Sequence, residues 1–307
     1  MRTKYIFPKN TIPYLAAIFS MVFFGMSFIW TKILLEDFGP LTIILLRLVI
    51  SSILLAAYLL ISRKMRFKKE DLKYFMALAF FEPFLYFIGE NFGVKYVSPT
   101  IASMIVSTIP LITPIFVFIY LKERLSKYNF LGLLVSFGGV LTLLLTKNST
   151  LEFSAKGIAL LFFAVAATIG YSILVKKLTD KYSSINIVFF QNIIGLIYFI
   201  PVFLIWEGRD FTRVNMDFKT LAALLQLSVF ASTLAFIFLT KSIATIGVNR
   251  TNVFINLIPV VTALFSFVIF GDLLSAQEII GILIVISGLF LSQLKGRTKE
   301  IIIHEDI

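Results

Sequence analysis

The sequence predicts an all-α polytopic membrane protein, with ten transmembrane helices arranged as two inverted five-helix repeats. Composition is the first reason: 59% of the 307 residues are hydrophobic and only 15% are charged, unlike a soluble domain of this length. The second is that apolar stretches of about 20 residues, long enough to cross about 30 Å of hydrocarbon, recur along the chain. The third is that segment 107–145 has a second, gap-free copy at 256–294.

The apolar stretches are continuous rather than alternating, which favours helices over a β-barrel. The expected spans are 12–34, 40–62, 73–91, 99–121, 128–146, 156–176, 184–206, 219–240, 248–270 and 277–294. The connections are short, so consecutive helices should be antiparallel neighbours. We expect residues 1–147 to form the first repeat, and 148–307 to form the second repeat plus a cytoplasmic tail.

Lys and Arg concentrate in every second connection, most densely at 63–73. Because basic loops stay on the cytoplasmic side, both termini should be cytoplasmic, in a multi-pass protein of the inner (plasma) membrane. This asymmetry accounts for the net charge of +11 without a nucleic-acid partner. The chain has no cysteine and its one histidine lies outside the spans, so we expect no metal site and no cofactor.

The repeat matches at the residues that shape helices, not only at apolar positions. One constant shift pairs Pro110 with Pro259, Thr113 with Thr262, Gly132 with Gly281 and Gly139 with Gly288. With five spans in each half, an odd number, the second copy must enter the membrane from the opposite side. Inverted repeats are typical of transporters, whose site lies near the midplane between the halves.

These motifs resemble the drug/metabolite transporter superfamily, and within it the ten-helix EamA-type transporters. The resemblance is carried by Pro40 and Arg47, by KYVSPTIASMIVSTIPLITPIFVFIYLKERLS with Gly132 and Gly139, and by SIATIGVNRTNVFINLIPVVTALFSFVIFGDLLS with Gly281 and Gly288. Asp272 stands where the family generally has Glu, which keeps the carboxylate. The resemblance implies transport of small metabolites, often export of amino acids or related compounds, with the glycine-rich fifth and tenth helices as scaffold.

The most polar stripe in any span is in the third. Glu82, Tyr86 and Glu90 follow each other at helical spacing on one face, bordered by Asn91. A carboxylate at this depth must face the interior, pair, or hold a proton. The stripe is therefore either a cavity wall that binds an amino group or protons, or a set of structural hydrogen bonds. The second half has no carboxylates at the equivalent positions, which predicts a cavity of asymmetric charge.

Arg47 lies about 10 Å below the outer end of the second span, between the depths of Glu90 and Glu82. It either anchors a substrate carboxylate or pairs with one of these glutamates. Gln191, its counterpart in the second half, is a further buried polar candidate, and so are Asn192 and Gln226. Each is either a contact to solute or a hydrogen bond between helices.

Pro110 and Pro259 should bend the fourth and ninth helices at equivalent points, either as ordinary kinks or as paired gates. Three residues before each proline, Ser107 and Asn256 could meet the freed backbone groups or the substrate. Trp30, Tyr171 and Tyr96 read as anchors at the membrane interface. Trp30 is also a candidate for the substrate site because it adjoins Lys32.

The function expected from these features is secondary active transport of small organic metabolites by alternating access, with export the expected direction. Coupling to protons through Glu82 and uncoupled facilitation are the two alternatives. The chain has no nucleotide-binding loop and no Ser/His/Asp constellation in the spans, so we do not expect an enzyme; a lipid-modifying membrane enzyme is the other alternative. The expected partners are the solute, protons and the bilayer, with the chain a monomer or a homodimer.

Overall fold

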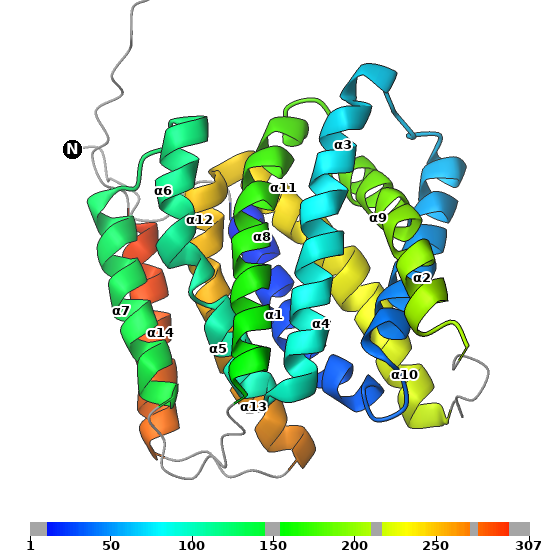
Figure 1. The fold of residues 1–307 in the computed structure, drawn as a ribbon. Helices are drawn as coiled ribbons and strands as arrows, with labels where there is room; N and C mark the ends of the chain where they lie inside the picture. Colours follow the sequence, from blue (N-terminus) through cyan, green and yellow to red (C-terminus); the bar gives the residue numbers. More distant parts are fainter. Residues whose placement is uncertain (1–10, 145–153, 210–216, 271–275, 295–307) are drawn as a thin grey trace, which may run out of the picture.

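The computed structural model describes residues 11–144, 154–209, 217–270 and 276–294, and every element in these ranges is helical. The helices form one bundle, and their long axes run from one end of the bundle to the other (Figure 1). In chain order they are α1 (Ile12–Leu34), α2 (Pro40–Ser62), η1 (Lys69–Asp71), α3 (Leu72–Ala79), η2 (Phe80–Leu85), α4 (Tyr86–Tyr96), α5 (Pro99–Val106), α6 (Ile109–Leu121), α7 (Lys127–Leu144), α8 (Ala155–Thr179), α9 (Ser184–Trp206), α10 (Phe218–Gln226), η4 (Leu227–Ala235), α11 (Phe236–Ile246), α12 (Val248–Asn252), η5 (Val253–Asn256), α13 (Leu257–Phe270) and α14 (Ala276–Gln293).

Eight continuous segments of the described chain are long and apolar enough to cross a membrane, and each corresponds to an expected span. α7 and α14, of 18 residues each, occupy the places of the fifth and tenth spans. The all-α polytopic fold is therefore confirmed. The third and eighth spans are longer than expected, at Lys69–Tyr96 and Phe218–Ile246. The termini and the 147/148 boundary lie outside the described residues.

Helix packing repeats itself between the halves. α1 packs against η4 and α11, and its counterpart α8 packs against η2 and α4. In the same way α1 contacts α13, while α8 contacts α5 and α6. The counterparts α2 and α9 pack on each other, as do α7 and α14. Equivalent helices thus exchange partners across the interface, which is the pattern of a two-fold axis relating inverted repeats.

The fourth and ninth spans, which are equivalent in the repeat, are both interrupted near their prolines. The fourth divides into α5 and α6 at Ser107–Thr108, and Pro110 lies in the first turn of α6. In the ninth, a 3₁₀ turn at Val253–Asn256 separates α12 from α13, which contains Pro259. Both spans are thus interrupted just before the proline, which lacks the N–H that would bond to a carbonyl of the preceding turn. The role of the breaks as gates stays a prediction.

The third and eighth spans are also interrupted, at equivalent points, where the sequence pattern predicts continuous helices. η2 and η4 are π-helical segments in the middle of these spans. In η2 the backbone of Glu82 is extended (φ −149°, ψ 115°) just before Pro83. In η4 hydroxyls replace the proline: Thr233 Oγ1 donates to the Ser228 carbonyl at 2.9 Å, one π-helical turn earlier. π-Bulges of this kind concentrate at functional sites.

α7 and α14 lie side by side at one edge of the bundle (Figure 1). A Cβ added to Gly139 would lie 2.7 Å from the Gly281 carbonyl oxygen, and one added to Gly288 would meet the Ser136 backbone. Glycine is therefore required where the two backbones touch. Neither helix lines the central cavity described below, in keeping with the scaffold role that the resemblance implied.

Gly138 and Gly139 are neighbours that offer a matched test of this contact. Gly139→Ala should destabilise the protein by about 1–3 kcal/mol, because the methyl group forces α7 and α14 apart. Gly138→Ala should be neutral or stabilise by about 0.5–1 kcal/mol, because a Cβ there meets nothing within 4 Å. The free energy of unfolding of the purified protein in detergent measures both. Equal effects of the two substitutions would show that the α7–α14 contact is not tight.

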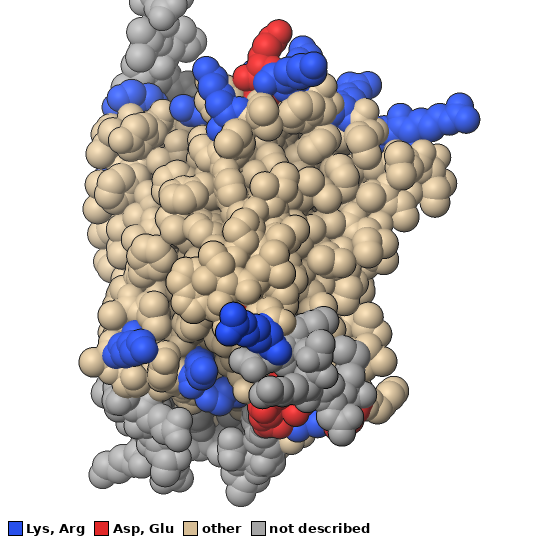
Figure 2. Space-filling view, turned by 45° about the vertical axis from the view of Figure 1, so that its right-hand side comes forward, with Lys and Arg blue, Asp and Glu red and all other residues tan. Residues whose placement is uncertain are grey.

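Charged residues gather at the two ends of the bundle and leave an uncharged band between them (Figure 2). We call one end the basic end; it carries Arg63, Arg66, Lys122, Arg124 and Arg250. There, Lys181 Nζ donates to Asp71 Oδ1 at 2.7 Å, and this hydrogen bond raises the pKa of Lys181. The uncharged band fits the hydrocarbon layer, and the basic end fits the predicted cytoplasmic side.

Candidate functional site

A cavity of about 50 Å³ lies inside the bundle, between the two halves. It is lined by residues of α1, α2, η2, α4, α5, α6, α8, α11, α12, η5 and α13. Arg47, Glu82, Tyr86 and Glu90 are its charged and phenolic residues from the first half. The structure therefore brings together four of the predicted site residues, from helices that the sequence separates.

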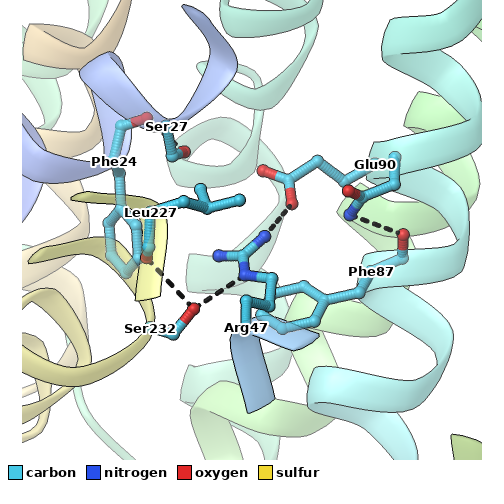
Figure 3. Close-up of polar contacts among 8 residues, drawn as sticks. Phe24, Ser27, Arg47, Phe87, Glu90, Leu227 and Ser232 are labelled. Carbon is cyan, nitrogen blue, oxygen red and sulfur yellow. Dashed lines mark hydrogen bonds and ion pairs between the residues drawn. The ribbon is translucent and has the colours of Figure 1, made fainter. Parts of the chain in front are cut away.

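Arg47 is almost completely buried, at 1% exposure, and two nitrogens of its guanidinium contact polar side chains (Figure 3). Nη1 lies 3.7 Å from Glu90 Oε2, and Nε donates to Ser232 Oγ at 2.7 Å. The guanidinium carbon lies 4.1 Å from the centre of the Phe87 ring. Of the two predicted roles for Arg47, the structure realises the ion pair, and it adds a cation–π contact.

The second half reaches Arg47 through the hydroxyls of η4. Ser232 Oγ, which accepts from Arg47, donates to the Leu227 carbonyl at 3.3 Å (Figure 3). Beside it, Ser51 Oγ donates to the Ser232 carbonyl and accepts from Asn192 Nδ2, and it lies 2.7 Å from Thr233 Oγ1. Asn192 therefore makes a hydrogen bond between helices, one of its two predicted roles. The network joins α2, α9 and the irregular turn of η4.

Glu82 lies at the break in the third span and is 5% exposed. Among the described residues, no side chain donates a hydrogen bond to its carboxylate or pairs with it at ion-pair distance. Arg47, the basic residue of this cavity, is engaged by Glu90. A buried carboxylate in this position is costly as an uncompensated charge, so it holds either a proton or a cationic group of a ligand.

The second half supplies neutral polar groups and rings to the cavity. Thr168, Tyr171 and Ser172 come from α8, and Asn252 comes from the end of α12. Asn252 is 3% exposed, and its Nδ2 has no hydrogen-bond partner among the described residues. No acidic or basic side chain of the second half is found among the described lining residues, as predicted from the missing carboxylates.

Four predicted site residues do not line the cavity. Asn91 Nδ2 donates to the Phe87 carbonyl within α4, and Asn256 Nδ2 donates to Ser136 Oγ on α7. Gln191 is buried at 1% exposure, and neither of its amide atoms has a partner among the described residues. Trp30 packs on Phe230, with ring centres 6.1 Å apart, and is 4% exposed.

Three local predictions are wrong. Trp30 is not an interface anchor, because neighbouring helices bury it. Tyr171 is not one either: it is 1% exposed and lines the cavity. Gln226 is exposed rather than buried. In each case a single sequence gives the depth of a residue in its span. It does not show whether that residue faces the lipid or the neighbouring helices.

Asn252 and Ser232 were not predicted as site residues. A signal for Asn252 exists in the sequence: it stands one turn before Asn256 in the polar string 249–252, which opens an otherwise apolar span. Ser232 had no comparable signal, because its contact with Arg47 joins residues 185 positions apart.

The cavity offers a negative group for an ammonium ion and neutral hydrogen-bond donors for a carboxylate. Glu82 offers an acceptor for an ammonium group, while Asn252 Nδ2 and Tyr171 offer donors for a carboxylate or carbonyl. Phe24, Phe28 and Phe236 supply apolar walls. No group of three or more His, Asp or Glu that could hold a metal ion is found in the described parts of the chain.

Comparison with known proteins gives one family match and several relatives. The family model described as the EamA-like transporter family matches residues 11–145 and again 155–294. An "Uncharacterized transporter" of Archaeoglobus fulgidus is 25% identical over 276 residues, which are 89% of this chain and 95% of the relative. The "Uncharacterized transporter YetK" of Bacillus subtilis is 24% identical over 297 residues, covering 95% and 90%.

Among solved structures, one titled "Crystal structure of protein" superimposes with a TM-score of 0.73 at 15% sequence identity. The match covers 91% of this chain and 96% of the other. At this identity the likeness shows a shared fold and carries no information on the solute.

Proposed function

The chain belongs to the EamA-like transporter family, and on this basis we propose that it is a secondary active transporter that exports small organic metabolites. The observation that carries the proposal is the buried cavity between the halves. In it the Glu82 carboxylate, which has no ion-pair partner among the described residues, lies beside the Arg47–Glu90 pair. Polar groups inside a hydrophobic bundle are costly, and they persist where solutes or ions pass. We propose no enzymatic activity for this chain.

Amino acids or closely related compounds are the substrate class that the lining favours. Their ammonium group suits Glu82, and their carboxylate suits Asn252 Nδ2, which has no partner among the described residues. The phenylalanines suit an apolar side chain. Arg47 contributes less to binding the solute carboxylate than a free arginine would, because Glu90 already neutralises its charge.

Alternating access is the proposed mechanism. The cavity of about 50 Å³ is far smaller than the roughly 300–1,000 Å³ of typical ligand sites, so the halves must separate to admit a solute. The interruptions in the third, fourth, eighth and ninth spans supply bending points on both sides of the pseudo-two-fold axis. Equivalent bends in the two halves would give an outward-open and an inward-open form.

Proton coupling is the proposed driving mechanism. A carboxylate that binds either a proton or the ammonium group of a solute exchanges one for the other, which amounts to antiport. Uncoupled facilitation is the alternative, in which Glu82 stays in one protonation state. We place the protein in the inner (plasma) membrane with its basic end and both termini cytoplasmic, in line with the positive-inside rule.

Reconstituted vesicles test the proposal. A panel of amino acids, nucleobases and organic cations is offered to protein-containing and protein-free vesicles, with and without an imposed pH gradient. We expect flux of at least one amino-acid-like solute, accelerated by the gradient. Flux that is equal with and without the gradient would favour the uncoupled alternative, and no flux of any solute would contradict transport of this class.

A further inference from the structure

A second cavity, of about 310 Å³, lies at the basic end of the bundle, away from the central cavity. It is formed where the end of α6 and the start of α7 meet the end of α11 and the start of α12; α6 and α12 lie close together there (Figure 1). Arg124, Arg250, Asn249 and Glu123 line it. At this volume it falls within the range of ligand sites.

Glu123 forms no ion pair with these arginines among the described residues, and its carboxylate is held by backbone N–H groups of α12. Oε2 accepts from the Val248 backbone N–H at 3.1 Å, and Oε1 accepts from the Asn249 N–H at 2.8 Å. The carboxylate thus occupies the start of α12. Among the described residues neither Arg124 nor Arg250 forms an ion pair, and both side chains are exposed. With two arginines and one glutamate, the lining of the cavity carries a net charge of +1, and both arginines lie at its rim.

Asn249 adds a hydrogen-bond acceptor to the positive charges of the arginines. Its Nδ2 donates to the Glu123 carbonyl at 3.2 Å, so the orientation of the amide is fixed. Its Oδ1 has no hydrogen-bond partner among the described residues, and the residue is 3% exposed. A buried carbonyl oxygen without a donor is costly, so a ligand with an N–H or O–H group would be favoured here.

The surroundings join this cavity to the bilayer. The Arg124 guanidinium carbon lies 5.7 Å from the centre of the Phe118 ring on α6. Phe118, Ile119 and Tyr120 are exposed, at 46%, 51% and 62%, along the last turn of that helix. Apolar side chains therefore run from the uncharged band to the arginines, as an acyl chain leading to its head group would require.

We propose that this cavity binds the head group of a phospholipid, with its phosphate at Arg124 and Arg250 and an N–H or O–H donor at Asn249 Oδ1. Phosphatidylethanolamine and phosphatidylglycerol carry both groups. Phosphatidylcholine carries the phosphate but has no N–H or O–H to donate. Basic pockets between helices at the cytoplasmic face are suited to lipid phosphates.

Native mass spectrometry of the purified full chain in detergent tests the proposal by counting bound lipids. Phosphatidylethanolamine and phosphatidylcholine with identical acyl chains are compared, which tests the role of Asn249 without altering the protein. The double variant Arg124→Gln/Arg250→Gln tests the phosphate contact. Its matched control is Arg63→Gln/Arg66→Gln, which removes the same charge from the same end outside the cavity. Thermal midpoints check that all variants are folded.

Wild type and the control variant should retain phosphatidylethanolamine in preference to phosphatidylcholine, and the double cavity variant should bind it roughly 30-fold more weakly. Equal retention of the two lipids would overturn the proposal, as would equal loss in the cavity and control variants. Soluble phosphoethanolamine is added as a competitor. If it displaces the lipid at concentrations comparable to the lipid itself, the ligand is a free phosphate compound and the lipid proposal fails.

Discussion

Replacing Glu82 by Gln should abolish the stimulation of solute flux by a pH gradient in reconstituted vesicles. Glutamine has nearly the shape of glutamic acid, but its amide neither binds nor releases a proton at the pH values on either side of the gradient. Because Glu82 lies buried in the central cavity and the cavity's guanidinium is engaged by Glu90, no other carboxylate there is free to replace it. The initial rate of flux with the gradient should fall to the rate that the same vesicles show without it.

Glu70→Gln is the matched control, since Glu70 is exposed at the start of the same span. It should leave the gradient-driven flux unchanged. Solute exchange without a gradient should survive in Glu82→Gln to a measurable extent if the amide still hydrogen bonds the solute. A Glu82→Gln protein that responds to the gradient like wild type would exclude Glu82 as the proton site.

Breaking the Arg47–Glu90 pair should have the largest effect on stability. Arg47→Met leaves Glu90 buried, with 7% of its side chain exposed, without a cation, and removes the hydrogen bond to Ser232. Loss of one partner of a buried pair costs about 3–5 kcal/mol. In Arg47→Met/Glu90→Gln the orphaned charge is gone, so the double variant should be more stable than Arg47→Met alone. Free energies of unfolding in detergent measure all three proteins.

The exposed pair Lys219–Glu36 serves as the control for this cycle. Its side chains are 59% and 63% exposed and 3.2 Å apart, so removing either should cost less than about 1 kcal/mol. If Arg47→Met were no more destabilising than Lys219→Met, the buried pair would contribute little, and Arg47 would be available for a solute after all.

Periodicity and repetition were enough to predict most of the fold. Span length is set by bilayer thickness, so the apolar runs mark the helices, and the prolines at 110 and 259 mark two breaks. The breaks at η2 and η4 were missed for different reasons. Pro83 gives a sequence signal for the break at η2, but the helical spacing of Glu82, Tyr86 and Glu90 predicts a continuous helix there. η4 contains no proline, and its break coincides with hydroxyl-to-carbonyl hydrogen bonds.

The site was predictable only in part. A carboxylate or an arginine inside an apolar run is conspicuous because its burial is costly, so Arg47, Glu82 and Glu90 were identified. Serine, asparagine and tyrosine are tolerated in many settings, and only the rotation of each helix decides whether they face a cavity. Tyr171 and Asn252 face it, while Asn256 turns instead to Ser136.

Labelling of a single cysteine in the central cavity tests alternating access most directly, and the natural sequence has no cysteine to interfere. Thr168→Cys places a thiol on the cavity wall, and Phe163→Cys on the same helix, at a residue 44% exposed on the bundle surface, is the control. A membrane-impermeant maleimide is applied to right-side-out and inside-out vesicles. We expect the cavity cysteine to be labelled from both sides, and the lipid-facing control from neither. Labelling of the cavity cysteine from one side only, or from neither, would contradict alternating access.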